Sequence, residues 1–269
     1  MRVGIDLKKS LQQNADSYYE RSKKAKKKLV GVKKAIIDMG KKIEKLKKEE
    51  EASKKETKVV KKRKRKWFEK FHWFVSSNGF LVIGGKDAKS NEIVVKKHMD
   101  ESDLYFHPEI QGASHVVVKS KDNSAPEQTL REAAQFAAAF SKAWKEGIPA
   151  IDVYSVLPKQ VSKKSPSGEA IGPGAFMIYG ERKWFNKTPL NFAVGVKEDD
   201  GSYVIVSGPA SAVEKQAAFS VQLKQGSQSK GSIAKKLKSI FEEKLGEKNI
   251  IDLDEIIAML PAGEFEIEK

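Results

Sequence analysis

The chain has 269 residues, of which 51 are Lys or Arg and 36 are Asp or Glu, giving a formal net charge of +15. It contains no cysteine, which excludes disulfides and thiolate metal sites, and its apolar runs are shorter than the roughly 20 residues that span a bilayer. The charged N-terminus lacks the apolar segment of a signal peptide, so we expect a soluble, cytoplasmic protein without a membrane partner.

The positive charge is concentrated in the first quarter of the chain. Residues 1–66 hold 25 Lys and Arg against 9 Asp and Glu, a net charge of +16, whereas residues 67–269 have a net charge of −1. A segment with such an excess of positive charge favours a polyanionic partner. When its basic side chains neutralise phosphates, condensed counterions are released, and this release favours binding. A solvated, self-repelling helix is the alternative that charge alone leaves open.

Residues 1–66 are expected to form a basic coiled-coil arm. Apolar or small residues recur in alternating steps of four and three over five heptads, which indicates a left-handed coiled coil. Gly31 and Gly40 weaken this helix, so packing against a partner must stabilise it. Residues 52–66 are too few to cover the whole seam, so either a short return helix covers part of it or a second chain does. The seam residues are Leu11, Ala15, Tyr18, Ser22, Ala25, Leu29, Val32, Ile36, Met39, Ile43 and Leu46.

A compact α+β module is predicted over residues 67–197. A basic run at 61–66 leads into an aromatic cluster at 67–74. Asn78-Gly79 is typical of a hairpin turn, and a helix opening at Pro126 with Ser124 as its cap would present small residues to a sheet as far as Trp144. An antiparallel meander and three further strands are predicted from apolar runs at 74–75, 80–83, 93–95, 104–106, 116–118, 151–157, 176–179 and 192–196.

Residues 198–269 are expected to form a small α/β C-terminal extension. It would contain a strand at 203–206, a short helix through Val213 and Ala217, and a strand at 219–223. A glycine- and serine-containing stretch at 225–232 predicts a flexible loop, followed by helices at about 231–245 and 252–260. The predicted fold class of the whole chain is therefore α+β.

No catalytic, metal or cofactor site is predicted. His98, His107 and His115 lie close in sequence, but their spacing sets no metal geometry. The glycine-rich stretches at 84–85 and 168–174 do not match a phosphate cradle between a strand and a helix. Ser162-Lys163 lacks an identifiable oxyanion hole, so Lys163 and Lys164 are better interpreted as phosphate contacts.

Several motifs occur in a defined order along residues 10–197. They are Asn14-Ala15-Asp16-Ser17-Tyr18-Tyr19, the segment 67–77, Ile83-Gly84-Gly85-Lys86-Asp87-Ala88 with Asn91-Glu92, Tyr105-Phe106-His107 with Gly112-Ala113, Ser141-Lys142-Ala143-Trp144, and Gln160-Val161-Ser162-Lys163 with Ser167-Gly168-Glu169 and the segment 174–178. Together they resemble the C-terminal half of the NFACT family of ribosome quality-control factors in its archaeal form. The tail resembles the archaeal C-terminal extension.

The resemblance implies a protein that binds obstructed large ribosomal subunits and tRNA and supports C-terminal tailing of stalled nascent chains. The arm would contact ribosomal RNA or protein, the module would bind RNA, and the ribosome would perform peptide transfer, so no catalytic residue is required. The chain departs from the family pattern at Lys86, Pro108-Glu109 and Gln111, and the resemblance does not extend to the family's N-terminal domain. The coiled coil would form a homodimer or pair with an N-terminal NFACT half.

The function predicted from the sequence is therefore non-enzymatic binding of tRNA and rRNA. Two alternatives stay open: a metal- or carboxylate-dependent nucleic-acid-processing enzyme with polar residues His107, Asp87 and Glu92, and a coiled-coil dimerising scaffold. The predicted RNA-binding residues are Lys61, Lys62, Arg63, Lys64, Arg65, Lys66, Lys86, His107, Gln160, Ser162, Lys163 and Lys164.

Overall fold

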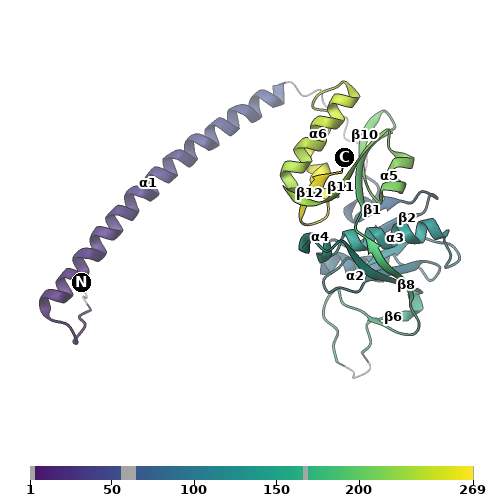
Figure 1. Cartoon of the computed structure of the whole chain (residues 1–269), viewed down its shortest axis with the longest axis horizontal. Helices are drawn as coiled ribbons and strands as arrows, with labels where there is room; N and C mark the ends of the chain where they lie inside the picture. The colour runs from purple at the N-terminus through teal and green to yellow at the C-terminus, as the bar shows by residue number, and fades with distance from the viewer. Residues whose placement is uncertain (1–3, 56–64, 166–168, 269) are drawn as a thin grey trace. The chain divides into compact units, whose positions relative to one another are not determined.

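A computed structural model describes the backbone of residues 4–55, 65–165 and 169–268. The chain divides into two compact units, residues 1–57 and residues 58–269. Figure 1 draws both units and labels many of their helices and strands. Across the described residues, every helix is too short or too polar to cross a bilayer.

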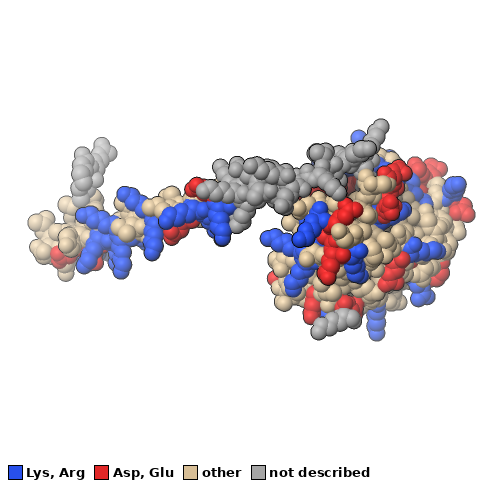
Figure 2. Space-filling view, turned by 90° about the horizontal axis from the view of Figure 1, so that it is seen from above, with Lys and Arg blue, Asp and Glu red and all other residues tan. Residues whose placement is uncertain are grey.

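The first unit is built on the long helix α1 (Leu11–Lys55), as the seam predicts. Ser10 begins it with a reciprocal cap, in which Ser10 Oγ accepts from the N–H of Gln13 at 3.2 Å and Gln13 Oε1 accepts from the N–H of Ser10 at 2.9 Å. The seam side chains from Leu11 to Ile43 are exposed within the unit, with Leu29 at 56% and Ile36 at 65%. Figure 2 shows lysine side chains distributed along this helix. The coiled-coil partner stays a prediction.

The second unit contains a six-stranded antiparallel sheet that follows the 3-10 turn η1 (Trp67–Lys70). The hairpin predicted at Asn78-Gly79 is confirmed, because Val75 lies opposite Leu81 and Gly79 takes a φ of +87°. One strand departs from a sequential meander, since β4 lies between β2 and β3. In spatial order the strands are β1 (His72–Val75), β2 (Leu81–Gly84), β4 (Val116–Val118), β3 (Leu104–Pro108), β5 (Ala150–Val156) and β8 (Lys183–Pro189).

The strand predicted at 93–95 is wrong, because these residues lie in α2 (Ala88–Lys97). The carboxylate of Asp87 begins this helix by accepting the N–H of Ser90 at 2.7 Å. Ile93, Val94 and Val95 are β-branched and favour a strand by composition. The cap and the burial of Val94 and Val95 in the core outweigh that preference.

Two helices pack on the face of the six-stranded sheet that lies opposite α2. One continuous helix was predicted there. The first, α3 (Glu127–Ala139), begins after Pro126 as expected, but no side chain caps it, so the predicted Ser124 cap is wrong. The helix ends at Phe140, and Ser141 Oγ then accepts the N–H of Ala143 at 3.1 Å to begin α4 (Lys142–Glu146). After β5, the chain forms the turn η2 (Pro158–Gln160) and a small hairpin of β6 (Val161–Ser162) and β7 (Met177–Ile178).

A second, four-stranded sheet forms in the C-terminal part of the chain, together with three helices. The flexible loop predicted at 225–232 is wrong, because β11 (Phe219–Ser229) continues directly into α6 (Lys230–Leu245), with Ser229 as the N-cap. The side chain of Gln225 donates to the backbone carbonyls of Ala143 and Ile148, which holds this stretch against α4. The remaining elements are β9 (Phe192–Asp199), β10 (Ser202–Gly208), β12 (Glu264–Ile267), α5 (Ala210–Gln216) and α7 (Leu253–Met259).

Both sheets share one hydrophobic core. Phe74 and Phe136 from the first sheet and its covering helix belong to the same buried cluster as Phe192 and Phe265 from the second. Trp144 Nε1 donates to the carbonyl of Glu264 at 3.1 Å. The predicted boundary between residues 197 and 198 falls inside β9, so the C-terminal residues complete the core of the module.

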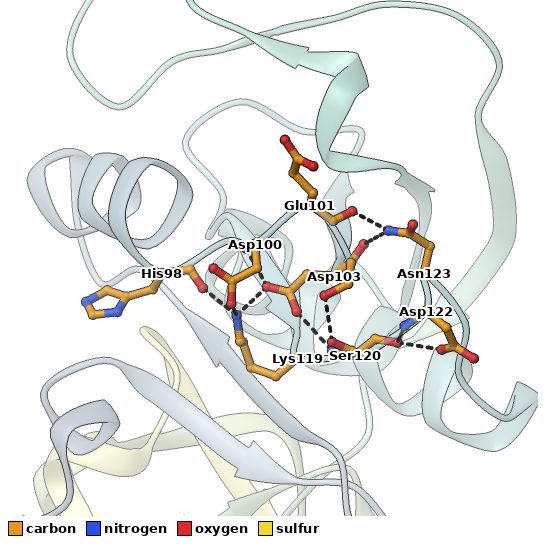
Figure 3. A network of polar contacts seen from close by, with 9 residues as sticks. His98, Asp100, Glu101, Asp103, Lys119, Ser120, Asp122 and Asn123 are labelled. Atoms are coloured by element: carbon orange, nitrogen blue, oxygen red, sulfur yellow. Dashed lines mark hydrogen bonds and ion pairs between the residues drawn. The ribbon is translucent and has the colours of Figure 1, made fainter.

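A polar network joins the loop before β3 to the loop after β4 (Figure 3). Asp103 is fully buried, and its carboxylate accepts the N–H of Asp100 at 2.7 Å, the N–H of Ser120 at 2.9 Å and the Nζ of Lys119. Lys119 also donates to the carbonyl of His98 at 2.9 Å. Burying a charge is tolerable when it is paired in this way, and the network fixes this end of the sheet.

Candidate nucleic-acid interface

The second unit contains a cleft of about 620 Å³. Most of its lining comes from four segments: the turn from β2 into α2, the segment before β4, the beginning of α4 and the loop at 173–176. His72 on β1, His107 on β3 and Ala262 complete it. The lining residues are His72, Gly85, Lys86, Asp87, Ala88, Asn91, His107, Gln111, Gly112, Ala113, Ser114, His115, Phe140, Ser141, Lys142, Lys145, Pro173, Gly174, Ala175, Phe176 and Ala262.

The turn at Gly84-Gly85 shapes one wall through a close approach of two backbones. A Cβ added to Gly85 would lie 2.6 Å from the Cα of Asn91, so only glycine fits. Asn91 uses this proximity to bridge two segments. Its Oδ1 accepts the N–H of His115 at 3.0 Å, and its Nδ2 donates to the carbonyl of Ala113 at 3.4 Å. The N–H of Gly85 donates to the carbonyl of His115 at 3.2 Å, which holds the wall to β4.

Three histidines line the cleft, and burial keeps all three uncharged at neutral pH. It lowers the pKa of His72 to about 3, with the positive charges of Lys86 and Lys230 adding to the effect. Burial also lowers the pKa of His107 to about 4 and that of His115 to about 3. Each neutral imidazole has one N–H donor and one acceptor nitrogen.

A buried tyrosine positions one of these rings. The hydroxyl of Tyr105 and Nδ1 of His115 are hydrogen-bonded at 2.6 Å, and the ring of His107 packs 4.7 Å from the ring of His115. Burial raises the pKa of Tyr105, so its phenol stays protonated. His98, the third histidine of the sequence cluster, lies apart and stacks on Trp67 at 4.6 Å.

Lysines lie at the mouth of the cleft. Lys142 and Lys145 on α4 are exposed, and Lys86 extends from the turn before α2. Burial lowers the pKa of Lys86, and the nearby charge of Arg65 acts in the same direction. Asp87 also lines the cleft, but its carboxylate is engaged in capping α2. The mouth therefore has an excess of positive charge above a neutral floor.

The segment at 173–176 forms another wall, and Glu92 ties it and Lys163 to α2. Glu92 Oε2 accepts Nζ of Lys163 at 3.2 Å and the N–H of Gly174 at 2.9 Å, while Lys96 pairs with the other carboxylate oxygen at 2.5 Å. Lys163 Nζ lies 4.5 Å from the centre of the Phe176 ring, which in turn packs edge-on against His115 at 5.4 Å.

The tether through Glu92 should depend on pH. Its interactions with Lys96, with the N–H of Gly174 and with Lys163 lower its pKa from 4.5 to about 2. Because the folded pKa is the lower one, the stabilisation is complete above 4.5 and is lost as the pH falls toward 2. We expect Glu92→Gln to be less stable than the wild type in urea unfolding at neutral pH, with the difference shrinking over that range.

A matched control for this prediction is Glu146→Gln, which removes an exposed carboxylate on α4. It should unfold like the wild type at every pH. A destabilisation of Glu92→Gln that is as large at pH 2 as at neutral pH would contradict the ionic tether.

Of the predicted RNA-binding residues that the structure describes, Lys86 and His107 are the two that line the cleft. Lys61, Lys62, Arg63 and Lys64 lie outside the described residues. Arg65 pairs with Glu255 and Lys66 pairs with Asp199, each at 3.7 Å. The side chain of Gln160 bonds the backbone of Leu157, Tyr179 and Glu181, and the hydroxyl of Ser162 accepts the N–H of Lys164. Lys163 is held by Glu92 in the wall, and Lys164 is exposed.

Several lining residues were missed as site residues by the sequence reasoning. His72 was grouped with the aromatic cluster, and Lys142 appeared only in a motif of the family resemblance. Phe140 was assigned to the buried face of a predicted helix, and Phe176 to a predicted strand. These residues line the cleft because folding brings together segments that are distant in the sequence. The one local signal was Gly84-Gly85, whose close approach to α2 was not anticipated.

Comparison with known proteins identifies the class to which this fold and cleft belong. Residues 70–180 match the family model described as the NFACT protein RNA binding domain, and they include every lining residue of the cleft except Ala262. The chain thus carries an NFACT RNA-binding domain within a larger α+β unit. It belongs to the NFACT family.

Relatives with this domain extend the likeness beyond residues 70–180. The chain is 46% identical over 208 residues to the archaeal Rqc2 homolog aRqcH of Methanocaldococcus jannaschii, an alignment that covers 77% of this chain and 30% of that protein. It is 37% identical over 200 residues to the ribosome quality control complex subunit NEMF homolog of Drosophila melanogaster, covering 72% and 20% respectively. The chain therefore spans about a third or less of the length of these relatives.

A solved structure of the C-terminal part of a fibronectin/fibrinogen-binding protein from Streptococcus suis is also similar. It is 24% identical, with a TM-score of 0.38, and the match covers 50% of this chain and 49% of that one.

Proposed function

We propose that this chain is the RNA- and ribosome-binding part of a cytoplasmic ribosome quality-control factor. In this proposal it binds obstructed large ribosomal subunits and tRNA, and so supports C-terminal tailing of stalled nascent chains. The observation that carries the proposal is the match of residues 70–180 to an RNA-binding domain, together with the lysine-edged cleft inside that region. The names of the relatives, which refer to ribosome quality control, agree with it.

Charge supplies the affinity in this proposal. Residues 1–66 have a net charge of +16, and Figure 2 shows lysines along the described part of α1. Basic groups spread over a helix can contact successive phosphates of a folded RNA. The arm would provide most of the binding free energy, and the cleft in the second unit would add contacts of its own.

The proposed role needs no catalytic residue in this chain. Both carboxylates of the enzymatic alternative have structural partners, since Asp87 caps α2 and Glu92 binds Lys163 and Lys96. A general acid or base needs a carboxylate that can reach the substrate. These contacts favour a binding function over nucleic-acid processing.

The test is a titration of labelled tRNA with the full chain at increasing salt, alongside co-sedimentation with large ribosomal subunits. We expect the tRNA affinity to fall by about 1,000-fold or more between 50 and 200 mM salt, as for proteins that make about six or more phosphate contacts. We also expect the chain to sediment with large subunits and the RNA to stay intact. Salt-independent affinity or absence from the subunit fraction would refute the proposal, and cleaved RNA would favour the enzymatic alternative.

A further inference from the structure

One buried atom in the cleft lacks a partner. Among the described residues, Nδ1 of His72 is a buried polar atom without a hydrogen bond, and the residue lines the cleft. An unpaired buried nitrogen is costly, so a ligand that supplies its partner gains affinity there. The ring is held in place by stacking on Phe140, with ring centres 3.9 Å apart.

The floor as a whole is suited to a neutral, planar ligand with mixed polarity. His72, His107 and His115 are uncharged because burial lowers their pKa values to between about 3 and 4. A neutral imidazole can donate or accept at a ring nitrogen that has no protein partner, as at Nδ1 of His72, whereas Nδ1 of His115 is already bonded to Tyr105. The edge of a nucleobase carries the same mixture, whereas a bare anion would leave the acceptor nitrogens unsatisfied.

The walls provide aromatic surface, and the mouth provides charge. Phe176 is fixed against His115, and Phe140 backs His72. Such rings stack on bases of any sequence. Lys86 at the edge of the cleft can pair with a phosphate, and so can Lys142 and Lys145 of α4. A volume of about 620 Å³ lies in the size range of small-molecule sites.

We propose that this cleft binds a single unpaired nucleotide of the RNA, with the base inside against His72, His107 and His115 and the phosphate at Lys86, Lys142 and Lys145. The inference rests on the proposed RNA-binding function and assigns it a second, distinct contact besides the arm. A paired base cannot enter, because its edge is occupied and its faces are stacked in the helix. The cleft therefore selects single-stranded loops or ends.

The first experiment monitors the histidine ring signals of the full chain by NMR during titration with AMP, GMP, CMP or UMP. We expect at least one nucleotide to shift the signals of His72, His107 or His115, with a dissociation constant of about 1 mM or below. Inorganic phosphate at the same concentration should leave these ring signals unchanged. Equal shifts with phosphate alone, or no shift with any of the four nucleotides, would overturn the inference.

Two variants test the assignment to the cleft. Ala175→Trp places a large side chain at an exposed lining position, and His72→Phe keeps a ring against Phe140 but removes the unpaired nitrogen. Both should weaken nucleotide binding by about tenfold or more. The matched control is Ala170→Trp, an equally exposed alanine of the same loop that does not line the cleft, and it should bind like the wild type.

The outcomes separate this inference from the proposed function. Ala175→Trp should weaken binding of a single-stranded oligonucleotide by the full chain, while binding of a blunt RNA duplex stays unchanged. If Ala175→Trp left both affinities at the wild-type value, the nucleotide site would be wrong, and strong tRNA binding in the same assay would leave the proposed function standing. If the wild type bound neither tRNA nor ribosomal subunits but still bound a mononucleotide, the proposed function would be wrong instead.

Discussion

Replacing the six basic residues at 61–66 by glutamine is expected to lower the affinity for tRNA by about 100-fold at moderate salt. Each lost phosphate contact also removes released counterions, so the slope of log affinity against log salt should become shallower by about 1 per contact. The expectation rests on the sequence, since Lys61 to Lys64 lie outside the described residues. Fluorescence anisotropy with labelled tRNA at several salt concentrations measures both quantities.

A matched control separates local contacts from overall charge. It also removes six positive charges, but from exposed lysines that lie C-terminal to residue 120, and it should change the tRNA affinity much less. The control positions are Lys121, Lys215, Lys224, Lys235, Lys236 and Lys248. Equal losses in both variants would show that net charge, and not the run at 61–66, accounts for the affinity. The arm variant should still bind mononucleotides like the wild type.

Gly85→Ala is expected to destabilise the second unit by about 3 kcal/mol, because the added methyl group has no space. Its Cβ would lie 2.6 Å from the Cα of Asn91, so α2 must move away from the β2 turn. That movement would strain the hydrogen bond between Asn91 Oδ1 and the N–H of His115. Urea unfolding followed by circular dichroism gives the free energy of unfolding.

Gly172→Ala provides the control for this prediction. A Cβ at Gly172 would meet nothing within 4 Å, so this variant should unfold within about 0.5 kcal/mol of the wild type. If Gly85→Ala were as stable as Gly172→Ala, the close packing of the turn on α2 would be wrong. If the Gly85→Ala variant is destabilised but still folds at low temperature, it should also lose mononucleotide binding, since the same turn forms a wall of the cleft.

Local patterns of apolar, capping and turn residues predicted most of the secondary structure. Period and capping are local properties, so α1, the hairpin at Asn78-Gly79 and α6 could be anticipated from neighbouring residues. Residues 93–95 and 225–232 were misassigned where tertiary contacts outweigh composition. The first is helical because Asp87 caps its helix and the core buries it. The second is strand as far as Ser229, where it pairs with β12 and is held by α4, and then begins α6.

The sequence by itself determined that this protein has a highly basic helical arm, an α+β body and the motifs of an RNA-binding family. Charge, the spacing of apolar residues and the order of motifs are all visible in the sequence without knowledge of tertiary contacts. Only the tertiary structure decided that His72, His107 and His115 meet beneath Lys86 and the lysines of α4. Those residues come from β1, the turn before α2, β3, the segment before β4 and α4, which together extend from residue 72 to residue 145. Their charge state is likewise a product of folding, since burial, not residue type, holds the imidazoles neutral.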